Sequence, residues 1–154
     1  MPDVSSRLVD VYPYRLIKGI PQFLLLHRAP DVAYAGQWRM VGGGIEDEET
    51  AWEAGLRELR EETGQVPAHF WALPSANRFY EWETDRVHVI PAFAAEITEE
   101  PTLNHEHDRA DWFAPNAAAG RLLWPEPKRL VHLAARCLQD GIPPSCVIPG
   151  RLEA

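Results

Sequence analysis

The glutamates at positions 58, 61 and 62 are the residues of this sequence best suited to chemistry. A helix turns by about 100° per residue, which would place Glu58, Glu61 and Glu62 within one face roughly 100° wide. Carboxylates this close repel one another by roughly a few tenths of a kcal/mol for each exposed pair four residues apart, and a bound cation would relieve that repulsion. Mg²⁺ prefers such oxygen ligands and usually keeps water and phosphate oxygens in its shell. The glutamates therefore predict a metal site that could polarise a phosphoryl group and activate water.

The segment that must position these glutamates carries helix signals at both ends. Thr50 is followed three residues later by Glu53, which is the capping-box arrangement, and Gly64 suits the position just after a helix end. We expect a helix over residues 51–63. Its apolar stripe lies on a separate face and consists of Trp52, Leu56 and Leu59. The helix can therefore pack on one side and present its carboxylates on another.

The alternative interpretation of three glutamates alone is a solvated acidic helix face. The wider pattern favours the metal site. Eight positions follow the spacing G-x5-E-x7-R-E-U-x-E-E-x-G, where U is a bulky apolar residue: Gly43, Glu49, Arg57, Glu58, Leu59, Glu61, Glu62 and Gly64. This pattern resembles the Nudix box, and eight specified positions at fixed spacing make a chance match rare.

The resemblance to the Nudix family implies a fold, a reaction and a cofactor. The fold is an α/β/α sandwich with a mixed β-sheet. The reaction is hydrolysis of a phosphoanhydride bond in a nucleoside diphosphate derivative, with Mg²⁺ as the cofactor and Mn²⁺ able to substitute for it. The metal ligands implied are the carboxylates of Glu58, Glu61 and Glu62 and the backbone carbonyl of Gly43.

Two further positions of the box follow from the same resemblance. Arg57 would hold a box carboxylate in place, either Glu49 or Glu61. Gln65 stands where the family usually has an apolar residue, and this departure affects packing at the helix exit rather than a metal ligand.

Segments outside the box indicate a substrate group. The runs FYEWETDRVHVIPAFAAEI, EHDRADWF and WPEPKRLV are similar to bacterial relatives described as dATP pyrophosphohydrolases or dihydroneopterin triphosphate pyrophosphatases. A nucleoside triphosphate such as dATP, or dihydroneopterin triphosphate, is therefore the favoured substrate. Two alternatives stay open, a dinucleoside polyphosphate hydrolase and a Nudix module that binds a nucleotide without cleaving it.

Glu106 lies in a polar loop, where many Nudix enzymes supply a further acidic ligand or general base. A carboxylate from a loop could bind a second cation or take a proton from the attacking water. An exposed loop glutamate is the alternative, and either Glu61 or Glu106 could serve as the base. His105 and His107 flank Glu106, and we expect both to be exposed to solvent rather than to bind metal.

Substrate recognition is expected from one arginine and several aromatic residues. Arg28 resembles a family position that faces the substrate phosphates, with a strand-end surface charge as the alternative. The candidates for stacking on a base or pterin are Trp38, Phe79, Tyr80 and Trp82, and the alternative is that they belong to the core. Strand alternation would place Tyr80 and Trp82 on the same face. Lys128 and Arg129 could contact phosphate or lie on a solvated helix face.

The remaining elements are expected as strands, turns and one more helix. The predicted strands are 8–16, 22–27, 69–73, 78–83, 87–97 and 111–113, the first two joined by a turn at KGIP. Residues 37–41 should run into a glycine turn at 42–44, Pro91 should mark a sheet edge or bulge, and 127–138 should form a terminal helix.

Composition narrows the class of protein. The 154 residues are 45% hydrophobic and 25% charged, as in one soluble globular domain over 1–154. A net charge of −8 without a basic run argues against binding a nucleic-acid polymer and favours small substrates or metal ions. Cys137 and Cys146 suggest neither disulfide nor zinc, and no signal peptide or membrane span is evident, so we expect a cytoplasmic monomer or homodimer.

Overall fold

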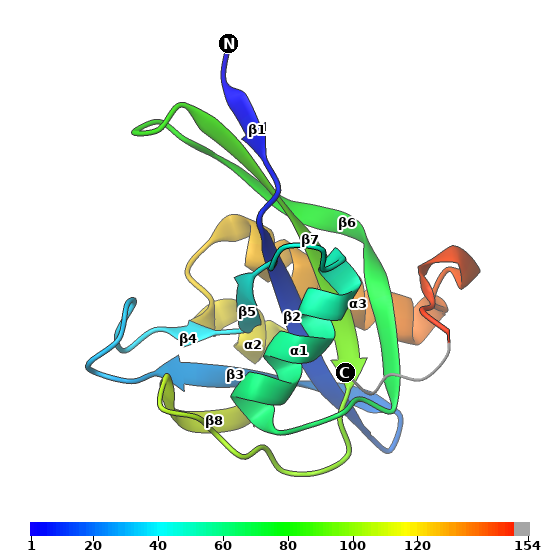
Figure 1. Cartoon of the computed structure of the whole chain (residues 1–154). Coiled ribbons are helices and arrows are strands. Elements are labelled where there is room, and N and C mark those ends of the chain that lie inside the picture. The colour runs from blue at the N-terminus through cyan, green and yellow to red at the C-terminus, as the bar shows by residue number, and fades with distance from the viewer. Residues whose placement is uncertain (150–154) are drawn as a thin grey trace.

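The computed structural model describes residues 1–149 and places one mixed β-sheet between helices (Figure 1). Its strands are β1 (Asp3–Ser5), β2 (Leu8–Ile17), β3 (Ile20–Arg28), β4 (Trp38–Arg39), β5 (Val41–Gly44), β6 (His69–Glu81), β7 (Arg86–Glu96) and β8 (His107–Phe113). Its helices are α1 (Ala51–Thr63), α2 (Pro115–Arg121) and α3 (Pro125–Asp140), followed by a 3₁₀ turn, η1 (Pro144–Cys146). Helix α1 covers one face of the sheet and helices α2 and α3 cover the other, which confirms the predicted α/β/α sandwich.

Strand β2 divides the sheet into two parts. Its residues 8–11 pair antiparallel with β5 and its residues 10–14 pair parallel with β7, whereas its residues 14–17 pair antiparallel with β3. Strand β3 extends beyond its pairing with β2 and pairs there with β4 and β8. Residues from β5 and from the start of β8 consequently reach the same helix, α1, although they are far apart in sequence.

The core has two layers because side chains alternate across the sheet. Val9 and Val11 of β2 pack toward α1, where they meet Leu59. Tyr12 and Tyr14 of the same strand pack toward α3. Burial of both faces fixes the register of β2, because a slip by one residue would exchange the two layers.

Helix α1 has the limits that the sequence predicts. The Thr50 hydroxyl accepts a hydrogen bond from the Glu53 N–H (3.2 Å), and the Glu53 carboxylate accepts one from the Thr50 N–H (3.1 Å). Gly64 adopts the left-handed conformation (φ 72°), and its N–H donates to the Arg60 carbonyl. Trp52 is the exception in the predicted apolar stripe, because it is 40% exposed.

Several strands differ from the prediction. The two segments expected at 69–73 and 78–83 form one strand, β6, with an irregularity between Ala72 and Ala76 where it faces Pro91 of β7. The unpaired stretch of β6 contains Pro74, which lacks a backbone donor, and it ends where Ala76 pairs with Pro91. Strand β8 begins at His107 rather than Asp111, because it pairs with β3 as far as Arg28.

The glycines at 42–44 lie in strand β5 and not in a turn, because β5 pairs with β2 along its whole length. Helix α2 was not predicted, and α3 extends beyond the expected 127–138 at both ends. Among residues 1–149, no helix is both long and apolar enough to cross a lipid bilayer.

Candidate active site

Glu62, in the last turn of α1, is the most deeply buried acid of the glutamate cluster, at 2% exposure. Its carboxyl shares a hydrogen bond with that of Glu58, one turn earlier. The Gly42 N–H donates to Glu62 Oε2 at 3.3 Å. The end of the helix is thereby joined to the glycine strand β5.

The electrostatics of this cluster oppose full ionisation. Burial raises the pKa of Glu62 to about 9, the negative charges of Glu58 and Glu106 add to the effect, and the Gly42 N–H opposes it. Burial also raises the pKa of Glu58, although hydrogen bonding to Arg57 counteracts this. The cluster thus holds more negative charge than its protein surroundings compensate, which is the condition under which carboxylates bind a cation.

Gly43 approaches the cluster through its backbone. A Cβ atom built at Gly43 would lie 2.2 Å from Glu58 Oε1, so the Glu58 carboxylate occupies the space of a side chain. The backbone of β5 therefore borders the carboxylates directly, as the predicted role of the Gly43 carbonyl requires.

Arg57 connects the cluster to the loop before the helix. Its Nε and Nη2 donate to the two oxygens of Glu49 at 2.8 and 3.0 Å, and Nη2 also donates to the Gly44 carbonyl at 2.8 Å. Its Nη1 donates to Glu58 at 2.9 Å and lies 3.3 Å from Glu61. Hydrogen bonding to Arg57 lowers the pKa of Glu49. The sequence left Glu49 and Glu61 open as partners, and Arg57 contacts both, with the two-oxygen contact going to Glu49.

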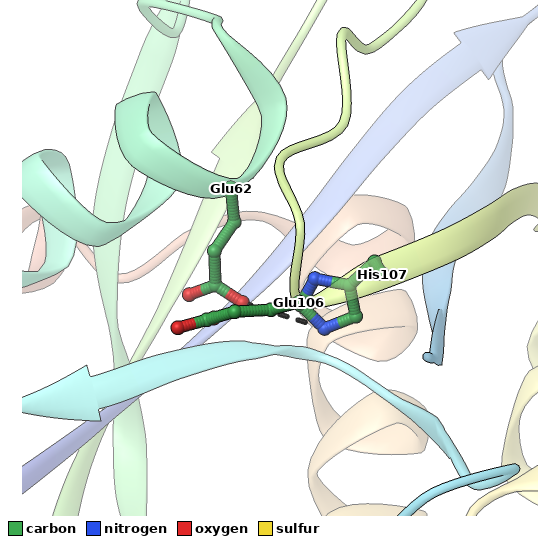
Figure 2. Close-up of side chains that lie close together, drawn as sticks. All are labelled: Glu62, Glu106 and His107. Atoms are coloured by element: carbon green, nitrogen blue, oxygen red, sulfur yellow. Dashed lines mark ion pairs between the residues drawn. The ribbon is translucent and has the colours of Figure 1, made fainter. Parts of the chain in front are cut away.

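Glu106 faces Glu62 from the loop that precedes β8 (Figure 2). Arg28 Nη1 lies 3.6 Å from Glu106 Oε2, and Arg28 Nε donates to the Ala33 carbonyl at 2.9 Å. The Asn104 side chain accepts from the Glu106 N–H and donates to the Glu61 carbonyl at 3.1 Å. This loop is therefore attached to the end of α1, and Arg28 lies beside the cluster.

His107 is buried at 4% exposure, so the expectation of an exposed histidine was wrong. Its Nε2 lies 3.7 Å from Glu62 Oε1, and the pairing of β8 with β3 explains its inward direction. Burial lowers the pKa of His107 to about 4, and the positive charges of Arg28 and Arg39 add to the effect. The imidazole is consequently neutral at physiological pH. No local sequence signal marks this burial. It follows from the extension of β8 to His107, which the pairing with β3 produces.

Trp38 lies on the other side of the sheet from this cluster. Its ring packs edge-on against His27 at 5.0 Å and Phe113 at 5.4 Å between ring centroids. It also lines a surface hollow whose other walls include Met40, Leu123, Trp124 and Pro127. Trp38 thus has both a core contact and an accessible edge.

Tyr80 and Trp82 are not brought to the cluster. They lie at the end of the β6–β7 hairpin, which extends beside β1 away from the end of α1 (Figure 1), and are 55% and 75% exposed. Trp82 follows the last residue of β6, so the assumed strand alternation does not apply to it.

Lys128 and Arg129 hold α3 in place. Lys128 donates to the Ala119 carbonyl at 2.8 Å, and Arg129 donates to Glu126 at 2.7 Å and to Ser75 at 3.0 Å. Both residues therefore have structural partners outside the glutamate cluster.

The comparison with family models decides the family. The model described as the NUDIX domain matches residues 14–136. The chain belongs to the NUDIX domain family. The matched range contains the whole Nudix box together with Glu106 and His107.

Solved NUDIX structures resemble the chain over most of their length. A protein from Listeria monocytogenes assigned to the NUDIX hydrolases is 27% identical, with a TM-score of 0.73 over 87% of this chain and 94% of its own. The Ap4A hydrolase of C. elegans is 18% identical, with a TM-score of 0.71 over 86% of this chain and 97% of its own. The NUDIX domain of Shewanella oneidensis NrtR, solved with ADP-ribose, is 19% identical, with a TM-score of 0.65 over 90% of this chain and 89% of its own. None of the curated proteins matches.

Family membership and the intact box confirm the predicted pyrophosphohydrolase enzyme. NUDIX hydrolases generally depend on a divalent metal ion, and the donor set here fits one. The fit rests on two observations. Glu62 is buried beside the acids Glu58 and Glu106 without a positive charge that balances them, and the backbone of Gly43 borders the Glu58 carboxylate.

Proposed function

We propose that this NUDIX protein is a Mg²⁺-dependent hydrolase of a nucleoside triphosphate or a similar metabolite, with dATP or dihydroneopterin triphosphate favoured. The observation that carries the proposal is the pair formed by buried Glu62 and half-buried Glu58, with Glu106 facing Glu62 and all box carboxylates present. The residues that would hold Mg²⁺ are Gly43, through its carbonyl, and Glu58, Glu61, Glu62 and Glu106. The bound ion would polarise a phosphoryl oxygen and make water a better nucleophile.

The protein groups divide the remaining tasks. Glu61 or Glu106 takes the proton of the attacking water, since both are partly exposed beside the cluster, with side chains 53% and 38% accessible. Arg57 keeps Glu58 and Glu49 in place through its hydrogen bonds and so positions the cluster. Arg28, beside Glu106, suits the negative charge of the substrate phosphates.

The aromatic ring of the substrate would require a flat apolar contact. Trp38 is the strongest of the aromatic candidates, because it borders the hollow with Trp124 and Met40. Tyr80 and Trp82 would contact the substrate only if it extended to the hairpin end, as a longer ligand would. We propose a cytoplasmic single-domain protein whose partners are small molecules, as a monomer or homodimer.

A dinucleoside polyphosphate is the second candidate substrate. The similarity to the Ap4A hydrolase of C. elegans favours it, as do the exposed aromatic residues of the hairpin. The non-catalytic module is disfavoured, because such modules usually lack box carboxylates and this chain has them all.

A substrate panel with Mg²⁺ tests the proposal. It contains dATP, dihydroneopterin triphosphate and a dinucleoside polyphosphate, and released pyrophosphate or phosphate is measured. We expect fastest turnover of one of the first two, loss of turnover with a chelator, and strong reduction in Glu61→Gln. Fastest turnover of the dinucleoside polyphosphate would select the second candidate. Absence of metal-dependent release from all three by folded wild-type protein would overturn the proposal.

A further inference from the structure

The His107 imidazole lacks the partners that a buried polar group normally has. Its side chain is 1% exposed, and within residues 1–149 its Nδ1 has no hydrogen-bond partner. Its Nε2 is 3.7 Å from Glu62 Oε1, which is too long for a hydrogen bond. Buried polar atoms without partners are rare in folded proteins, and each calls for an explanation.

The ring nitrogen near the carboxylates is Nε2, and it is the nitrogen that could bind an ion there, with the imidazole proton on Nδ1. Figure 2 shows both ring nitrogens of His107 on the side that faces Glu62 and Glu106. One potential ligand atom from each of these three residues lies within 4.8 Å of the others. Ligand atoms bound at about 2.1 Å to one ion lie roughly 3 to 4.2 Å apart, so small side-chain movements would suffice to enclose a cation.

We propose that His107 supplies a nitrogen ligand to a metal position that Glu62 and Glu106 complete. The inference rests on the proposed metal-dependent function and adds to it a mixed nitrogen–oxygen site. Glu62 would be shared between this position and an all-oxygen position at Glu58 and the Gly43 carbonyl. Glu106 can contribute to it while Arg28 remains at its side, because a carboxylate has two oxygens.

A nitrogen ligand changes which ion the position prefers. Imidazole suits transition-metal ions, whereas Mg²⁺ favours oxygen donors and water. Mn²⁺ accepts both kinds of ligand. We therefore expect Mn²⁺ to bind at this position more tightly than Mg²⁺, and His107 to account for the difference.

Pulsed electron paramagnetic resonance of bound Mn²⁺ tests the proposal directly. The full-length protein is loaded with about one equivalent of Mn²⁺ in a buffer without nitrogen ligands, and the spectrum is examined for coupling to ¹⁴N. We expect imidazole ¹⁴N coupling in wild type, its loss in His107→Gln, and its retention in His105→Gln, which changes the exposed neighbouring histidine. The wild-type spectrum is decisive without any substitution, so the test does not depend on the folding of His107→Gln.

The affinities provide a second readout. We expect His107→Gln to weaken Mn²⁺ binding by about tenfold or more, by the scale known for groups around metal sites, and to change Mg²⁺ binding much less. Bound Mn²⁺ without ¹⁴N coupling in wild type, or coupling that persists in His107→Gln, would overturn the nitrogen ligand and leave the proposed function intact. Failure of wild type to bind either ion would overturn the proposed metal-dependent function as well.

Discussion

Two buried carboxylates, Glu62 and Asp10, lie on opposite sides of the same glycine. The Gly42 N–H donates to Glu62, whereas a Cβ built on Gly42 would point toward Asp10 and lie 3.2 Å from its Oδ1. Glu62 is 2% exposed and Asp10 is 7% exposed. The two acids therefore share burial and location in the sheet, and differ in their neighbours.

The neighbours give the two acids different properties. Asp10 accepts a hydrogen bond from the Asn77 amide at 3.0 Å. Burial raises the pKa of Asp10 to about 6, while Asn77 and the charge of Arg39 oppose the shift. Glu62 faces other acids, and its pKa rises further, to about 9. Burial alone does not make a metal site, because the protein itself satisfies Asp10 and leaves Glu62 without a compensating charge.

Matched amide substitutions should separate the two acids by activity. We expect Glu62→Gln to reduce turnover by several orders of magnitude, because an amide keeps the shape and removes the charge that would hold the metal. Asp10→Asn should leave turnover close to wild type. The measurement is the turnover number at saturating substrate and modest Mg²⁺. Similar turnover numbers in both variants would remove the functional distinction between Glu62 and Asp10.

Glu106 is one of the charges that distinguish Glu62 from Asp10. We expect Glu106→Gln to lower kcat by roughly 10²- to 10⁴-fold and to change KM less, since a base or metal ligand acts mainly on the transition state. Hydrolysis is measured across pH at constant Mg²⁺. A variant with the wild-type rate and pH profile would exclude this role and make Glu61 the preferred base.

The pH dependence of stability should show both acids in the metal-free protein. Each has a pKa raised by folding, so the folded state holds a proton that the unfolded state has lost, and stability falls as the pH rises between the two values. For Asp10 this interval runs from 3.8 to about 6, which corresponds to about 3 kcal/mol. For Glu62 it runs from 4.5 to about 9.

Urea unfolding across pH, with a chelator present, measures these losses. Asp10→Asn should flatten the curve between about pH 4 and 6 only, whereas Glu62→Gln should flatten it from about pH 4.5 to about 9. Curves of equal slope for wild type and both variants would contradict the assigned pKa shifts.

Metal binding should stabilise the protein through Glu62 and not through Asp10. An ion at one hundred times its Kd stabilises the folded state by about 2.7 kcal/mol. We expect Mg²⁺ or Mn²⁺ to raise the Tm of wild type and Asp10→Asn by similar amounts, and to raise that of Glu62→Gln much less. An unchanged Tm in wild type together with a raised Tm in Glu62→Gln would locate the metal elsewhere.

Features with local signals were predictable from sequence. Thr50, Glu53 and Gly64 mark both ends of α1 without reference to the rest of the chain, and the limits of that helix are correct. The box spacing likewise identified the cluster around Glu58, Glu62 and Arg57, because these residues share one helix.

Features that depend on distant pairing were not predictable. The burial of His107 follows from the pairing of β8 with β3, and the strand conformation of Gly43 follows from the pairing of β5 with β2. The separation of Trp82 from the cluster reflects the direction of a hairpin, which residue types alone do not determine.

The contact between Gly43 and Glu58 limits how this sequence can diverge. Even alanine at position 43 would place a methyl carbon 2.2 Å from Glu58 Oε1, far inside van der Waals contact, so the carboxylate at the end of the Glu58 side chain would have to move. A displaced Glu58 carboxylate would lose its 2.9 Å hydrogen bond from Arg57. A mutation at Gly43 would therefore displace a carboxylate of the glutamate cluster even where the strand pairing survives, so descendants of this enzyme could explore new side chains around the substrate far more freely than at this one backbone position.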